Sequence, residues 1–187
     1  MSMDTKLTVD EIELAIVNST LFNKRSDIIV PNVSWGLLNH EADMVIMTKS
    51  GYLTEIEIKR SWEDFKADFK KGHKHDDERI SKLYYCVPES IQGDVIQFLN
   101  EKFDNWLNIP CGVLSFTDRG SIACIKDCPP SRGRKLFLEE QLTIARLGCL
   151  RIWNLKQKLI DHEQRSCLLY TSPSPRDSTS SRMPSSA

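Results

Sequence analysis

The chain has 187 residues, of which 40% are hydrophobic and 27% charged, and its formal net charge is −1. This length is enough for one domain with its own core. No apolar run approaches the length that crosses a membrane, and no signal peptide opens the sequence. We therefore expect a cytoplasmic protein with no membrane partner.

The end of the chain differs in kind from the rest. Cys167 to Asp177 resembles a translated sequencing adapter, and Ser181 to Ala187 resembles the translated primer that follows such an adapter. We interpret residues 166–187 as a disordered tail that is a sequencing artefact, and residues 1–165 as the domain. A natural Ser/Pro-rich tail is the alternative. On the artefact interpretation, the sequence does not define the natural C-terminus.

The first part of the domain predicts a helix and then three strands. Thr8 can cap a helix that begins at Val9, with Glu11 as the third residue of a capping box. The apolar side of this helix is expected to carry Ile12, Leu14, Ala15 and Ile16. Strands are expected at 28–35, 43–47 and 52–60.

The second part alternates helices and strands. Ser61 can cap the next helix, and Asp118-Arg119-Gly120 is a turn signal between two short strands. The expected elements are a helix at 62–71, a polar loop at 73–79, a strand at 82–87, a helix at 90–107, a hairpin of strands 111–116 and 122–125, and a long helix at 136–160 with a break at Gly148. This order predicts a single α/β domain with a mixed central sheet flanked by helices.

The strand at 52–60 carries charges where a buried strand is normally apolar. Because side chains alternate along a strand, Glu55, Glu57 and Lys59 share one face. The neighbouring strand begins at Asp43. Carboxylates beside an apolar strand are costly unless they are paired or bind a metal, so this pattern indicates a hydrolytic metal site. The alternative is a solvated strand face with cross-strand ion pairs.

Cysteines and charge distribution permit further interpretations. Residues 1–57 carry four basic and nine acidic side chains, whereas residues 126–158 carry eight basic and three acidic ones. That asymmetry suits a metal site facing a polyanion, although ordinary surface variation also produces it.

Buried reduced thiols are the simplest interpretation of the five cysteines before the tail. A zinc or iron–sulfur module is the alternative, built from Cys111, Cys124, Cys128 and Cys149.

The order of elements, with Asp43 and Glu57-Ile58-Lys59 on successive strands, resembles the PD-(D/E)XK nuclease superfamily. The stretch before the tail is similar to small phage and bacterial proteins related to the MmcB-type DNA-repair family. The segments that carry this resemblance are Glu41-Ala42-Asp43, Glu55 to Ser61, Lys82 to Pro88 and Arg146 to Trp153. Ala42 departs from the family pattern, in which proline precedes the aspartate.

The resemblance implies a restriction-endonuclease-like fold and a nuclease that hydrolyses DNA in phage or bacterial repair or recombination. Asp43 and Glu57 would hold Mg²⁺ or Mn²⁺, with the Ile58 carbonyl as a further ligand, and Lys59 would orient the attacking water. An acid from the first helix often completes such sites. Of Glu11 and Glu13 we expect Glu11, because it lies off the apolar side.

Basic residues elsewhere are candidates for DNA contact. The expected phosphate contacts are Lys70, His73, Lys74, Arg132 and Arg134. The alternative for the residues at 66–75 is a solvated helix face, because acidic side chains interleave with them. We do not expect His73 or His75 to ligate a metal, because a polar loop is a poor rigid platform.

Two functions from different classes follow. The first is a Mg²⁺-dependent DNA nuclease. The second is a catalytically silent nuclease fold that binds nucleic acid or a partner protein. Their discriminating feature is whether the side chains of Asp43, Glu57 and Lys59 converge. A homodimer is compatible with either.

Overall fold

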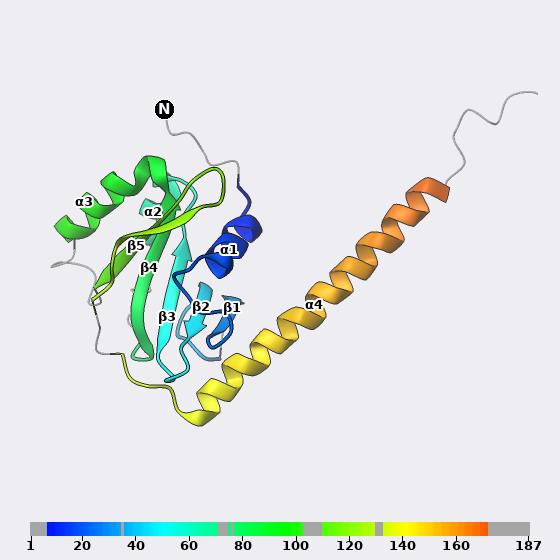
Figure 1. The fold of residues 1–187 in the computed structure, drawn as a ribbon, viewed down its shortest axis with the longest axis horizontal. Coiled ribbons are helices and arrows are strands. Elements are labelled where there is room, and N and C mark those ends of the chain that lie inside the picture. The colour runs from blue at the N-terminus through cyan, green and yellow to red at the C-terminus, as the bar shows by residue number, and fades with distance from the viewer. Residues whose placement is uncertain are drawn as a thin grey trace, which may run out of the picture. The chain divides into compact units, whose positions relative to one another are not determined.

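Six strands form one sheet in the order β1-β2-β3-β4-β5-β6 in a computed structural model (Figure 1). The structure describes residues 7–34, 36–70, 75, 77–102, 110–129 and 133–171. For residues 166–171 it describes the backbone alone. The strands are β1 (Ile28–Val33), β2 (Ala42–Met47), β3 (Leu53–Ile58), β4 (Ile80–Pro88), β5 (Cys111–Phe116) and β6 (Ile122–Lys126). The helices are α1 (Val9–Asn18), α2 (Trp62–Asp68), η1 (Glu89–Ile91), α3 (Gln92–Lys102) and α4 (Leu138–Thr171).

The sheet is mixed. The first three strands form an antiparallel meander, β3, β4 and β5 are parallel, and β6 returns antiparallel to β5. The parallel step from β3 to β4 requires a crossover, which α2 supplies. This arrangement confirms the predicted α/β fold with a mixed sheet flanked by helices.

Side chains alternate between the two faces of the central strands, so an apolar core forms on each face of the sheet. Ile56 and Ile58 of β3 pack against Ile12 and Ile16 of α1, on one face of the sheet. On the other face, Phe65 of α2 joins the apolar side chains of β4 and α3. Glu55 and Glu57 alternate with these isoleucines and therefore lie on the α2 face. Helix α1 thus covers the sheet opposite the charged side chains of β3.

A third cluster on the α2 face closes the β1–β2 end of the sheet. It includes Val45 and Met47 of β2, with Leu136 and Ile144 from the chain around the start of α4. The chain divides into two compact units, residues 1–151 and 152–187, so this first part of α4 belongs to the unit that holds the sheet. No described helix is both long and apolar enough to span a membrane.

Several element boundaries differ from the predicted ones. β1 ends at Val33, and it contains Pro31, which is tolerated because β1 is an edge strand. Gly148 does not break α4, and Leu14 is 61% exposed instead of joining the apolar side of α1. Helix α4 also continues to Thr171, six residues into the segment interpreted as a tail; residues 172–187 lie outside the described part.

Candidate functional site

The charged face of β3 is buried. Glu55, Glu57 and Lys59 are 0%, 3% and 4% exposed, so the alternative of a solvated strand face is wrong. The reason is tertiary: α2 and the chain segments before β2 and β4 cover this face. Buried charges persist only when they are paired and hydrogen-bonded, and each of these three has ionic partners.

The three predicted site residues converge at the start of β2 and the end of β3. The backbone N–H of Ile58 donates to Asp43 Oδ2 at 2.8 Å, and the N–H of Asp43 donates to Glu57 Oε1 at 3.4 Å. The ammonium of Lys59 lies 2.6 Å from Glu57 Oε2. Asp43 is half-buried, whereas Glu57 and Lys59 are enclosed, so Asp43 marks the more open side of the site.

Three further side chains extend this cluster. Asp68 at the end of α2 lies 3.2 Å from Lys59 Nζ, and its second oxygen lies 2.9 Å from His75 Nε2. His75 Nδ1 lies 2.7 Å from Glu55 Oε1, and His40 Nε2 lies 2.7 Å from the same oxygen. A continuous chain of ionic contacts therefore joins His40 to Glu57.

His75 was expected to lie in a polar loop that is a poor platform for a metal ligand. The structure corrects this expectation, because His75 is fully buried between two carboxylates. Sequence reasoning also missed His40 and Asp68. For Asp68 a signal existed: it follows Phe65 by three residues, which places it on the inward side of α2. His40 and His75 lie outside helices and strands, where no periodicity reports burial.

The charged side chains of the cluster shift one another's pKa values. Burial opposes ionisation of Glu55, but hydrogen bonds with His40 and His75 outweigh it and lower the pKa of Glu55 to about 2. Burial also opposes the charge on His75, yet hydrogen bonds with Asp68 and Glu55 raise its pKa to about 10. At neutral pH these two side chains are an ion pair.

Glu57 behaves in the opposite sense. Burial, together with the charges of Asp43 and Glu55, raises the pKa of Glu57 to about 8 despite the nearby Lys59. Burial alone would lower the pKa of Lys59, but the carboxylates of Glu57 and Asp68 raise it above its usual value. Lys59 is therefore a fixed cation, and Glu57 is a carboxyl group that a further positive charge would ionise.

Glu11, the helix-one acid expected to complete the site, is exposed and engaged at the start of α1. Glu11 accepts hydrogen bonds from the Thr8 backbone N–H at 2.7 Å and from the Thr8 hydroxyl at 2.8 Å, which completes the predicted capping box. Glu13 is half-buried, and burial and the charges of Asp10 and Asp43 raise its pKa to about 7. Of the two acids, Glu13 is the one whose pKa is raised by the charge of Asp43.

Buried acidic and histidine side chains are arranged so that they could hold a metal ion. Two groups qualify among the described residues: His40, Glu55 and His75, and Glu57, Asp68 and His75, each with ligand atoms within 4.8 Å of one another. Neither group contains a cysteine, so the cysteine-module alternative gains no support. Cys124 and Cys149 are in fact exposed.

The predicted DNA contacts are only partly described. Lys70 is exposed at the end of α2. The Arg134 guanidinium forms two hydrogen bonds of 2.7 Å with Glu140 and one of 2.9 Å with Glu78, which ties it to the protein. His73, Lys74 and Arg132 lie outside the described residues.

Comparisons with known proteins identify the fold without a function. No protein-family model and no curated protein matches the chain. Among solved structures, the chain is similar to SPO1766, a protein of unknown function from Silicibacter pomeroyi. The two share 16% sequence identity with a TM-score of 0.57, and the match covers 84% of this chain and 95% of that one. At this identity, the likeness shows a shared fold.

Proposed function

We propose that the protein is a Mg²⁺-dependent nuclease that hydrolyses DNA phosphodiester bonds. The observation that carries the proposal is the convergence of Asp43, Glu57 and Lys59 where β2 begins and β3 ends. Two carboxylates and an ammonium brought together on adjacent strands are the groups that a metal-assisted phosphodiester hydrolase needs. The likeness of element order and motif to the PD-(D/E)XK superfamily supports the same interpretation.

The residues fit a hard divalent cation. Asp43 and Glu57 would hold it, with the Ile58 carbonyl as a further ligand; all three donors are oxygen atoms, which Mg²⁺ and Mn²⁺ prefer. The raised pKa of Glu57, caused by burial and two neighbouring carboxylates, indicates a position where additional positive charge is favourable. When bound, Mg²⁺ supplies an acidified water and neutralises charge at the phosphate.

The protein side chains supply positioning and charge. Lys59 is held by Glu57 and Asp68, so its ammonium has a defined position from which to orient water and offset phosphate charge. Glu13 is the nearby half-buried acid whose pKa of about 7 suits proton exchange near neutral pH. Backbone phosphates would be contacted by basic side chains such as Lys70.

The test is a cleavage assay with chelator-treated protein and added Mg²⁺. Supercoiled, nicked, linear, branched and single-stranded DNA would each be tested against the parent, Asp43→Asn and Glu57→Gln. Glu41→Gln is the matched control, because Glu41 is an exposed acid two residues before Asp43. We expect both site variants to lose cleavage while the control retains it. Parent-like cleavage by Asp43→Asn would refute the assignment.

One observation supports the second function, a catalytically silent nuclease fold. Lys59 is 4% exposed and has two carboxylate partners, so its ammonium is not open to solvent in this conformation. A nuclease fold that binds DNA or a partner protein without cutting would show this closed arrangement. Binding of DNA without cleavage of any of the five substrates, with Mg²⁺ or Mn²⁺, would favour it.

A further inference from the structure

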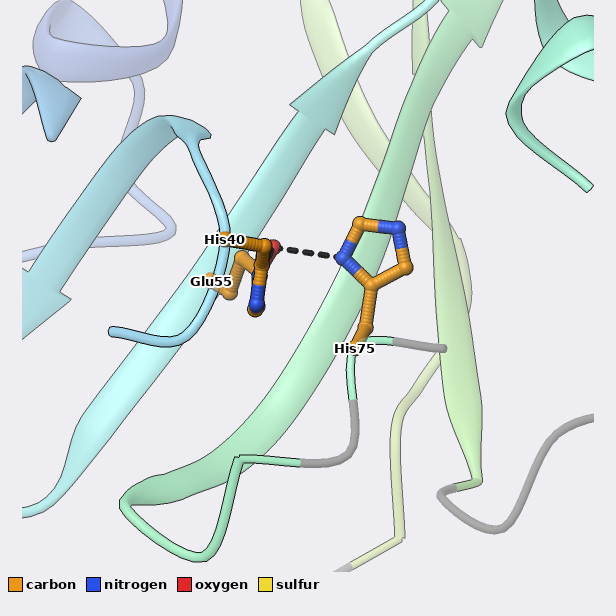
Figure 2. Close-up of side chains that lie close together, drawn as sticks. All are labelled: His40, Glu55 and His75. Carbon is orange, nitrogen blue, oxygen red and sulfur yellow. Dashed lines mark hydrogen bonds and ion pairs between the residues drawn. The ribbon is translucent and has the colours of Figure 1, made fainter. Parts of the chain in front are cut away.

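His40, Glu55 and His75 form a buried cluster beside the proposed Mg²⁺ site that the nuclease mechanism does not use. Glu55 projects from β3, while His40 and His75 come from the segments that precede β2 and β4 (Figure 2). Both imidazoles direct a ring nitrogen to Glu55 Oε1 at 2.7 Å. Three ligand atoms from three separate segments therefore meet at one point.

The outer nitrogen of each imidazole is already bound to an acceptor. His40 Nδ1 lies 2.6 Å from Asn39 Oδ1, and His75 Nε2 lies 2.9 Å from Asp68 Oδ2. Since an amide or carboxylate oxygen only accepts, the ring nitrogen donates in both contacts. When a metal ion displaces the protons on the inner nitrogens, their lone pairs face the ion beside Glu55. Metal-ligating histidines are held in the same way, with the outer N–H on a carboxylate or carbonyl oxygen.

A second observation concerns the other oxygen of Glu55. Glu55 is fully buried, and among the described residues its Oε2 has no hydrogen-bond partner. A buried carboxylate oxygen without a partner costs free energy comparable to a lost hydrogen bond or more. A cation bound to the Glu55 carboxylate would provide that partner.

The neighbouring group of Glu57, Asp68 and His75 does not need an ion. Lys59 Nζ lies 2.6 Å from Glu57 Oε2 and 3.2 Å from Asp68 Oδ1, so an ammonium already occupies the space between those carboxylates. The described residues place no lysine or arginine ion pair on Glu55. Of the two groups, the one centred on Glu55 is therefore the candidate for a cation.

We propose that His40, Glu55 and His75 bind a divalent cation of the zinc class. Two imidazole nitrogens and one carboxylate form a ligand set that suits Zn²⁺ better than Mg²⁺. Such an ion would fasten the segments before β2 and β4 to the central strand. The proposal does not depend on the nuclease function.

Co²⁺ is the probe, because it substitutes for Zn²⁺ and absorbs visible light when bound at low coordination number. The full chain, stripped of metal with chelator, would be titrated with Co²⁺ and then with Zn²⁺. We expect one Co²⁺ band that saturates at one equivalent and that Zn²⁺ abolishes. His40→Gln and Glu55→Gln should lose the band. His162→Gln, which changes an exposed histidine of α4, should keep it.

A readout in the parent protein covers the case in which the variants do not fold. Nitrogen NMR of the histidine rings should show that Zn²⁺ shifts Nε2 of His40 and Nδ1 of His75 and leaves His162 unchanged. The absence of these shifts, or a Co²⁺ band that persists in both folded variants, would overturn the proposal. Asp43→Asn should lose Mg²⁺-dependent cleavage and keep the Co²⁺ band, so this site and the nuclease site can fail separately.

Discussion

Lys59 and His75 are the basic members of a buried network whose acidic members are Glu55, Glu57 and Asp68. Each contact in the network is between 2.6 and 3.2 Å. Burial and the charges of Asp43 and Glu55 raise the pKa of Glu57 to about 8, which reduces the negative charge of the network at neutral pH. Buried ion pairs add little net stability, but removing one partner leaves an uncompensated charge that is costly. These residues therefore couple the proposed chemistry to folding.

Lys59→Met should reduce turnover and stability together. Single-turnover DNA cleavage should fall by about a hundredfold or more, because a positioned charge near the reacting phosphate is lost. The free energy of unfolding should fall by about 3–5 kcal/mol, since the buried Glu57 and Asp68 lose their shared cation. Binding of Mn²⁺, measured by isothermal titration, should persist.

Lys59→Arg is the companion variant, because it keeps the charge while changing its position. It should recover much of the stability lost in Lys59→Met and little of the turnover. Parent-like cleavage by Lys59→Met would remove Lys59 from the proposed mechanism. Loss of Mn²⁺ binding would instead show that Lys59 organises the carboxylates.

At the scale of elements, α1 presents two acids with different roles. Glu11 is used locally, in the capping box with Thr8, and this hydrogen bonding lowers its pKa. Glu13, two residues later, accepts a hydrogen bond from the Asn32 side-chain amide, and the charge of Asp43 contributes to its raised pKa. Two residues along an α-helix correspond to a rotation of about 200°, so the two side chains leave α1 on opposite sides.

Exchanging each acid for glutamine should separate stability from activity. Glu11→Gln should lower the melting temperature slightly, through a weaker cap, and leave DNA cleavage unchanged. Glu13→Gln should reduce cleavage, because it removes the half-buried acid beside Asp43, and should not lower the melting temperature. Paired thermal melts and Mg²⁺-dependent cleavage assays would measure both. The reverse pattern would return Glu11 to the site.

Arg134 links Glu78, which precedes β4, with Glu140 in the first turn of α4. Its hydrogen bonds with Glu140 lower the pKa of that carboxyl group, whose ordinary value is 4.5. A lowered pKa in the folded state means that the stabilisation is present above pH 4.5. It is lost as the pH falls through the pKa of the folded state.

Arg134→Met should therefore lower the melting temperature at pH 7, and its difference from the parent should shrink as the pH falls below 4.5. Arg119→Met, in the exposed turn between β5 and β6, is the control for loss of one surface charge. The measurement is a series of melts from pH 7 to pH 3. A difference that does not change with pH would show that the Arg134–Glu140 pair does not contribute. DNA affinity of the same variant would test the predicted phosphate contact.

At the scale of the whole molecule, the apolar clusters draw only on the sheet-containing unit. The described members of these clusters run from Leu7 to Leu147, within residues 1–151. The second unit begins at Ile152, and several of its large apolar side chains are exposed, including Trp153 and Leu155. The stability of the sheet should therefore not depend on the end of the chain.

Deletion of residues 166–187 should leave the melting temperature of the protein unchanged within error. The deleted segment contributes no described side chain to the apolar clusters, and its composition is rich in serine and proline. Differential scanning calorimetry of the full and shortened chains would measure the effect. A drop of several degrees would show that the segment packs as natural protein and would contradict the artefact interpretation.

The sequence alone was sufficient for the order of the strands and the main helices, and for placing Glu55 and Glu57 on one strand and Asp43 on its neighbour. These features are local: strand and helix periodicities, caps and turns are properties of neighbouring residues. Asp43, Glu57 and Lys59 lie together because two strands adjacent in the sequence pair, as the hydrogen bond from Asp43 to Glu57 and the ion pair of Glu57 with Lys59 show.

Only the tertiary structure decided which other residues join them. His40, Asp68 and His75 come from segments that pack over β3, and no local pattern encodes burial of a histidine in a loop. The same packing turns a face that would otherwise be solvated into a buried network, because each carboxylate removed from water must find a cation or donor. The tertiary structure likewise shows that the cap at Thr8 engages the Glu11 carboxylate locally, whereas Glu13 is half-buried.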